Sequence, residues 1–167
     1  MKLGELLRGT IRFVREWWFF GTASCLINYL VFFGIIHKDP TVDTELEEYV
    51  QYFKDAADLY SVKVNFNNLS VSFVDRFPEH DWVGLCQSGR GVSKFISIHK
   101  GYFKKAPPEV RYSLVAHELG HCVLGKSHVG GYLSDGCPQS IMHPSDGLFG
   151  CFFKHQDYYF KELFGLL

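Results

Sequence analysis

The chain carries two different hydrophobic patterns, separated by a change in composition. Residues 17–36 form a run of 20 residues without a charged side chain, which is the length that a helix needs to cross a bilayer. The segment His37-Lys38-Asp39-Pro40-Thr41 interrupts this run, and beyond it apolar residues recur at the spacings of helices and strands. We therefore expect an N-terminal segment, residues 1–38, and one folded domain, residues 39–167.

The pattern after the boundary predicts an α+β domain. Apolar residues at steps of three and four predict a helix over residues 43–60, which Thr41 or Asp43 can cap. A second helix is expected to begin near Pro107. Aromatic and apolar residues indicate a C-terminal helix over 154–162. Alternating apolar and polar residues, with turn residues between them, predict strands over 62–66, 69–74, 82–86 and 92–99.

Residues 17–36 are interpreted as a membrane anchor or as the apolar part of an export signal. Four basic residues precede the run and only Lys38 follows closely, so the positive-inside rule puts everything after His37 on the extracytoplasmic side. Thr22-Ala23-Ser24-Cys25 resembles a lipoprotein cleavage site without the expected leucine. A buried helix packed on the domain is a further interpretation. We expect a membrane-anchored or exported protein.

Composition limits the classes of partner. With a formal net charge of −1, the chain has no general attraction to nucleic acid, and 47% hydrophobic residues supply ample material for a core. An exported domain can form two disulfide bonds, in any of three pairings, from its four cysteines. Cys122 is interpreted instead as a buried thiol. The five cysteines of the chain are Cys25, Cys86, Cys122, Cys137 and Cys151.

The stretch A-H-E-L-G-H-C-V-L-G-K-S-H, residues 116–128, carries the candidate chemistry. On a helix, His117 and His121 lie one turn apart on the same face and can offer two imidazole nitrogens to one metal ion. Glu118 lies beside that ion, where it is better suited to take a proton from water than to bind the metal. A surface helix with two solvated histidines is the alternative interpretation of this short pattern.

A third metal ligand is expected after the helix. Gly125 can end the helix in a left-handed conformation, and a chain that turns there can bring His128 back to the same ion. The nearest substitutes for His128 are Asp135, His143 and His155, and a more distant one is Glu162 on the final helix.

Together with Ser140-Ile141-Met142-His143-Pro144, this motif resembles the metzincins, a clan of zinc metallopeptidases with an extended histidine motif and a methionine-containing turn beneath the metal. The resemblance covers roughly residues 43–164. It implies that Met142 lies in that turn. Pro144 stands where some members carry a tyrosine that reaches the metal, and it resembles the turn of the matrixins and adamalysins.

The resemblance implies one catalytic Zn²⁺ held by His117, His121 and His128, with Glu118 as general base. The spacing departs from the family pattern in one respect. Leu124 holds the family's glycine position, and the unit from Gly125 to His128 is displaced by one residue. A helix that is one residue longer, with the same turn after it, accounts for the displacement because its internal spacing is preserved.

The function implied is a zinc-dependent endopeptidase that hydrolyses peptide bonds through Glu-assisted attack of a zinc-bound water. The implied fold is a metzincin-like zincin domain: an N-terminal helix, a small twisted and mostly parallel sheet with an edge strand, the metal-binding helix, the methionine turn and a C-terminal helix, preceded by a hydrophobic N-terminal helix. An extended peptide is expected to pair with the edge of the sheet, for which residues 92–99 are the best candidate, and the family arrangement implies that residues 144–150 form one wall of the pocket. The expected substrate-binding residues are Val92, Ser93, Lys94, Phe95, Ile96, Leu148 and Phe149.

Two other classes of function remain open from the sequence. One is a membrane-tethered binding module in which zinc only stabilises the fold. The other is a membrane protein whose function lies in the apolar segment, although one uncharged span argues against transport.

Overall fold

The computed structural model describes residues 38–78, 80–88, 93–144 and 148–167. Asp39–Leu167 form one compact unit. The apolar run 17–36, and with it the predicted N-terminal hydrophobic helix, lies outside the described residues. In the parts of the chain that are described, no helix is both long enough and apolar enough to span a membrane.

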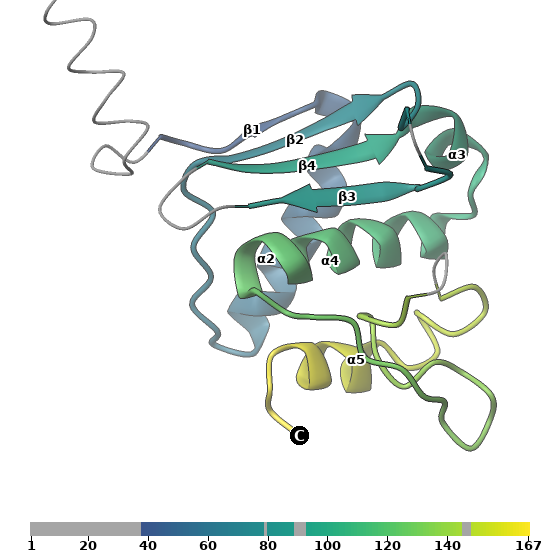
Figure 1. Cartoon of the computed structure of the whole chain (residues 1–167). Coiled ribbons are helices and arrows are strands. Elements are labelled where there is room, and N and C mark those ends of the chain that lie inside the picture. Colours follow the sequence, from purple (N-terminus) through teal and green to yellow (C-terminus); the bar gives the residue numbers. More distant parts are fainter. Residues whose placement is uncertain (1–37, 79, 89–92, 145–147) are drawn as a thin grey trace, which may run out of the picture. The chain divides into compact units, whose positions relative to one another are not determined.

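The domain is α+β and is built on a four-stranded mixed sheet (Figure 1). The strands lie in the order β1-β2-β4-β3, with β1, β2 and β4 parallel and β3 antiparallel to β4 at one edge. The prediction for β2 is confirmed at both ends, and those for β3 and β4 are confirmed to within two residues. The strands are β1 Thr41–Val42, β2 Leu69–Val74, β3 Gly84–Gln87 and β4 Lys94–His99.

The helices α2 and α4 pack on the same face of the sheet, and α5 lies on the far side of α4 from the strands (Figure 1). The three helices predicted from periodicity are present, whereas α3 and the two-residue strand β1 were not predicted. The helical elements are the 3-10 turn η1 Thr44–Leu46, α2 Glu47–Leu59, α3 Lys100–Lys105, α4 Pro108–Leu124 and α5 Gln156–Leu163.

The core lies between the sheet and the helices. Phe53 of α2, Ile96 of β4 and Leu119 of α4 are completely buried, and Phe152 and Phe160 close the core on the C-terminal side. Each large side chain removed from water contributes about 1.5–3 kcal/mol to folding. Helix α4 is thus fixed on several sides, and this fixes the direction in which its polar face points.

The predicted strand 62–66 is wrong. Its side chains alternate between half-buried and exposed, and Val64 and Phe66 pack against the core, yet the segment pairs with no strand. Both sides of β2 are already occupied, by β1 and β4. The alternation in sequence therefore reports which side chains face the core rather than hydrogen bonding in a sheet.

Asp43 precedes η1 as predicted, but its side chain does not cap the helix. The Asp43 carboxylate instead accepts a hydrogen bond of 2.8 Å from the backbone N–H of Phe73, which ties the start of the helix to β2.

Candidate metal centre

Helix α4 presents the motif and then stops abruptly. Pro108 occupies its first turn, and Gly125 ends it in the left-handed conformation with φ 67°, as predicted. The backbone N–H of Lys126 returns to the carbonyl oxygen of Gly120 at 3.0 Å. This reversal directs the chain back past the helix, so His128 comes to lie beside the two helical histidines.

Three imidazole nitrogens converge on one point. The Nε2 atoms of His117 and His121 lie 3.1 Å apart, and that of His128 lies 3.2 Å from the first and 3.1 Å from the second. Nitrogens that bind one tetrahedral zinc ion at about 2.0–2.1 Å are separated by about 3.3 Å. The three histidines therefore have the spacing of a zinc ligand set.

Hydrogen bonds on the other ring nitrogens fix which atom of each helical histidine faces the centre. Nδ1–H of His117 donates to the carbonyl oxygen of Ile141 at 2.8 Å, and Nδ1–H of His121 donates to that of Lys126 at 2.7 Å. Carbonyl oxygens only accept, so both neutral rings turn an Nε2 lone pair toward His128. Lone pairs that face one another across 3.1 Å repel unless a cation lies between them. The donor set thus fits Zn²⁺.

Burial favours the neutral, metal-binding form of these rings. It lowers the pKa of His117 to about 4, although the hydrogen bond to Ile141 acts in the opposite direction. It also lowers the pKa of His128. Protons compete with metal for imidazole nitrogen, so these shifts favour metal binding at neutral pH.

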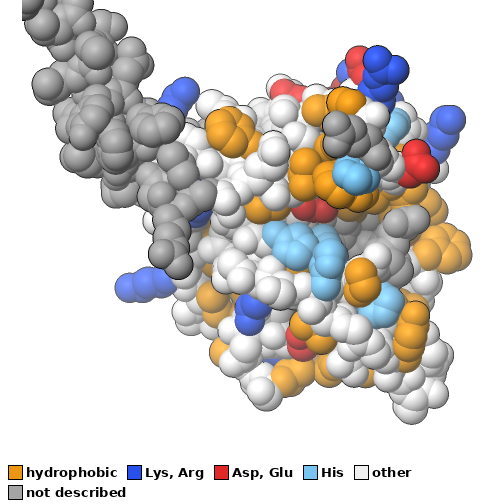
Figure 2. Space-filling view, in the orientation of Figure 1, with side chains coloured by type: hydrophobic (Ala, Val, Ile, Leu, Met, Phe, Trp, Pro, Cys, Tyr) orange, Lys and Arg blue, Asp and Glu red, His pale blue; other side chains and the backbone are white. Residues whose placement is uncertain are grey.

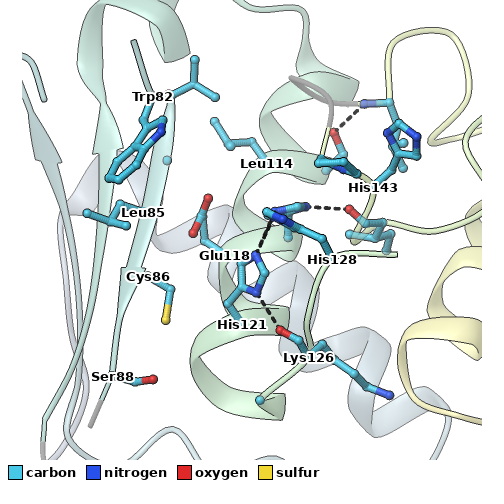
Figure 3. Close-up of a pocket in the computed structure, with 18 of the residues that line it drawn as sticks. Trp82, Leu85, Cys86, Ser88, Leu114, Glu118, His121, Lys126, His128 and His143 are labelled. Atoms are coloured by element: carbon cyan, nitrogen blue, oxygen red, sulfur yellow. Dashed lines mark hydrogen bonds between the residues drawn. The ribbon is translucent and has the colours of Figure 1, made fainter. Parts of the chain in front are cut away.

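Glu118 lies between the histidines and the edge strand β3 (Figure 3). Its side chain is buried, and burial raises its pKa to about 7, while a hydrogen bond from the backbone of Cys86 opposes the shift. Gly84 of β3 makes room for the carboxylate, because a Cβ atom there would lie 2.9 Å from Cδ of Glu118. The backbone of Cys86 thus holds the carboxylate by a hydrogen bond, and the missing side chain of Gly84 leaves space for it.

A disulfide bond joins Cys86 of β3 to Cys122 of α4, with the Cα atoms 5.6 Å apart. The interpretation of Cys122 as a free thiol is therefore wrong. Cys122 is buried as expected, but antiparallel pairing places Cys86 of β3 opposite the buried Ile96 of β4, and the sulfur atom of Cys86 bonds to that of Cys122 on α4. The bond ties the edge strand to the residue that follows His121.

The predicted turn lies directly under the histidines. Met142 is buried against Gly120, where a Cβ atom would lie 3.3 Å from Cε of Met142. Ser140 Oγ donates to Glu162 Oε2 at 2.7 Å and accepts from the N–H of Met142 at 2.9 Å. The carboxylate of Glu162 thus anchors the turn, and it does not belong to the group that converges on the centre.

The substitutes considered for His128 lie elsewhere. Asp135 accepts hydrogen bonds from Lys154 at 2.6 Å and His155 at 2.7 Å. Cys137, the third member of this group, is in a disulfide bond with Cys151. Because the sulfur atom of Cys137 is oxidised in a disulfide bond and the carboxylate of Asp135 is engaged by two cationic or polar side chains, this second group is a poor metal site. His143 lines the cleft beside Tyr132 but is not part of the histidine group.

The histidines open into a cleft of about 610 Å³. Figure 2 shows histidine side chains gathered on this face of the molecule, with an acidic side chain and hydrophobic side chains above them. Leu148, Pro144 and Leu114 line the cleft, as expected for the first two. Phe149 does not line it and is 70% exposed.

The prediction that residues 92–99 form the edge of the sheet is wrong. β4 lies between β2 and β3, so both of its edges are paired, and Ile96 is fully buried. Neither Ser93, Lys94 nor Phe95 lines the cleft, and Val92 lies outside the described residues. The edge strand beside the cleft is β3. Sequence reasoning missed the contributions of its residues Gly84 and Cys86. Only the strand order, which a single sequence does not reveal, identifies it.

Comparison of the chain with models of protein families, with curated proteins and with solved structures finds no match.

Proposed function

We propose that this protein is a zinc-dependent endopeptidase of the metzincin type. The observation that carries the proposal is the convergence of three Nε2 atoms within 3.2 Å of one another, beside a buried carboxylate that opens into the same cleft. A structural zinc site is usually closed by four protein ligands. Three imidazoles with no fourth donor in the described group favour an open, catalytic site.

The chemistry divides between the ion and the chain. When bound, zinc supplies a Lewis acid that lowers the pKa of a coordinated water and polarises a carbonyl group. Glu118 takes the proton from the attacking water and passes it to the departing amine. Burial beside Gly84 and Cys86 keeps this carboxylate poorly solvated and therefore basic enough for the transfer.

The peptide backbone is expected to bind along β3. Within the described residues this strand has one unpaired edge. Residues 84–86 of the strand line the cleft, as does Ser88 just after it, and Gly84 lies opposite Glu118. Hydrogen bonds from that edge fix an extended peptide without regard to its side chains. The role assigned from sequence to residues 92–96 thus passes to β3.

The alternative, a zinc-stabilised binding module without catalysis, predicts a closed ion and no need for Glu118. The buried carboxylate in the cleft argues against it, because burying an acid costs stability, and residues with strongly shifted pKa values of this kind cluster at functional sites.

The test combines metal content with hydrolysis. Elemental analysis of the purified full-length chain should give one zinc per molecule, and a mixed peptide library should be cleaved. Glu118→Gln should keep the zinc and lower the cleavage rate by about a hundredfold or more. Zinc binding with equal cleavage by parent and variant would refute the assigned base. Zinc binding with no cleavage by the parent would favour the binding module.

A further inference from the structure

An exposed aromatic cluster lies at one end of the cleft, in the loop that leads into β3. Trp82 lines the cleft and is 45% exposed. His80 stacks on the indole with ring centroids 3.9 Å apart, and Phe77 contacts it edge-on at 6.2 Å. The indole is therefore supported by neighbouring rings while much of its surface stays open. A tryptophan that served only the core would be buried instead.

Asp81 adds a negative charge at the same end. It lines the cleft, its side chain is exposed, and within the described ranges no hydrogen bond or ion pair engages it. Among the described residues, the other charged ones that line the cleft are Glu118 and Lys126. Figure 3 shows Lys126 at the opposite end of the histidine group from Trp82, so the charge near the indole is acidic.

An indole face beside a free carboxylate suits a cation. Tryptophan is the best aromatic partner for an ammonium or guanidinium group, and the aliphatic stem of arginine or lysine packs on the ring. An aromatic side chain would also stack on Trp82, but it would leave Asp81 unpaired. The two residues together therefore favour a basic side chain.

We propose that Trp82 and Asp81 form a subsite for an arginine or lysine side chain of the peptide substrate. This inference rests on the proposed function. Gly84 lies opposite Glu118, and Trp82 precedes it by two residues, about 7 Å along an extended chain. The basic residue of the substrate is thus expected two or three residues from the bond that is cleaved.

The fluorescence of Trp82 can report whether the proposed subsite is occupied. The chain contains three tryptophans, and Trp17→Phe with Trp18→Phe leaves Trp82 as the single tryptophan of the full-length protein, whose emission can be excited apart from that of tyrosine. In this background, zinc-loaded Glu118→Gln protein is titrated with peptides that differ only by arginine, lysine, citrulline, phenylalanine or alanine at one scanned position. At one such position, arginine and lysine should bind about three- to tenfold more tightly than citrulline, with a change in Trp82 emission.

Variants separate the two contributions. Asp81→Asn should lower the arginine-to-citrulline affinity ratio to the part that Trp82 alone supplies, about two- to fivefold at most, while leaving citrulline binding unchanged. Trp82→Ala, followed by calorimetry, should weaken both peptides. Asp75→Asn is the matched control, because Asp75 is an exposed acid of the same loop that does not line the cleft. It should leave the ratio unchanged.

The same peptides, offered to the active parent, distinguish the failure of this inference from that of the proposed function. Cleavage that shows no preference for a basic residue, or tightest binding of the phenylalanine peptide, would overturn the subsite and leave the peptidase standing. If the zinc-loaded protein neither binds nor cleaves any peptide, the proposed function fails and the subsite fails with it.

Discussion

Two differently built parts of the domain meet at the proposed metal centre. Residues 39–124 form the sheet and the helices α2 to α4, and their backbone is held by regular hydrogen bonding. Residues 125–167 contain only α5 and the isolated bridge between Tyr132 and Pro138 in their described part. The first half supplies two histidines and the glutamate by helical periodicity. The second supplies the third histidine and the turn beneath it.

The irregular half is held by individual contacts rather than by regular secondary structure. They include the disulfide bond between Cys137 and Cys151, backbone hydrogen bonds such as that from the N–H of Val129 to the carbonyl oxygen of Met142 at 2.9 Å, and side-chain hydrogen bonds. Tyr159 donates a hydrogen bond to the carbonyl of Pro138 at 2.7 Å, and Tyr158 donates one to that of Gln139 at 3.0 Å. Ser140 and Glu162 fix the turn itself. Each such bond contributes only about 0.5–1.5 kcal/mol. A ligand from this half therefore depends on many small interactions, whereas the two on α4 depend on one buried helix.

The largest expected effect comes from removing His128, the proposed zinc ligand that the irregular half supplies. His128→Ala should weaken zinc binding by about a thousandfold or more, because even the loss of an outer hydrogen-bond partner costs about ten- to a hundredfold. The helix content measured by circular dichroism should not change, since α4 is packed independently of His128. A competition titration with a chromophoric chelator measures the affinity. Undiminished affinity would assign the third ligand to another residue.

Removing each of the two disulfide bonds allows their contributions to the free energy of unfolding to be compared. Loop-closure entropy gives about 4 kcal/mol for Cys86–Cys122, which closes a separation of 36 residues, and about 3 kcal/mol for Cys137–Cys151, which closes 14. Replacing each pair with serine should lower the free energy of unfolding in that order, as measured by urea denaturation of the metal-free protein. A larger loss for the second pair would show that the irregular half depends on its bridge more than chain entropy predicts.

A glycine substitution tests the regular half at a single atom. Gly84→Ala should lower the cleavage rate by roughly ten- to a hundredfold, because its Cβ atom displaces the carboxylate of Glu118 by enough to spoil proton transfer. Zinc affinity should be unchanged. Gly130→Ala is the control, since no atom lies within 4 Å of a Cβ there. Equal rates for the parent and both variants would show that Glu118 needs no such space.

The smallest effect concerns pH, because two shifts within α4 oppose each other. The pKa of His117 is lowered from 6.5 to about 4, so the folded state loses stability as the pH falls from 6.5 to 4, where only the unfolded chain binds the proton readily. The pKa of Glu118, raised from 4.5 to about 7, adds stability over nearly the same range. Each amounts to about 3 kcal/mol at most, and in the metal-free parent they nearly cancel.

Glu118→Gln should remove the contribution by which Glu118 stabilises the fold as the pH falls. The metal-free variant should therefore lose up to about 3 kcal/mol more than the parent between pH 7 and pH 4.5, as followed by urea denaturation across that range. Parallel pH profiles for the two proteins would mean that the carboxylate is not buried in solution.

Sequence reasoning succeeded where one local rule decides the structure. Helical spacing predicted that His117 and His121 share one face of α4, and Gly125 predicted the reversal of the chain that places His128 beside them. It failed where the outcome depends on strand order. Residues 62–66 have the alternation of a strand but no free neighbour, and β4 lies inside the sheet rather than at its edge. The short helix α3 begins at His99, whose ring accepts the capping hydrogen bond that a smaller polar residue usually accepts.

The irregular half was the least predictable part of the site. Ser140 and Glu162 are 22 residues apart, and nothing in their local sequence announces a hydrogen bond between them. The pairing of cysteines was likewise open among three possibilities, because it depends on which segments the fold brings together. Contacts of this kind follow from the three-dimensional arrangement and are not encoded in any short motif.

The bond between Ser140 and Glu162 sets a condition on biosynthesis. Residues 39–124 contain all four strands and can begin to pack while later residues are still inside the ribosome. The turn under His117 acquires its anchor only when Glu162 has emerged. The nascent chain thus carries its histidine helix for some 40 residues of translation before the turn beneath that helix can be locked, which delays completion of the proposed metal site until synthesis has passed α5.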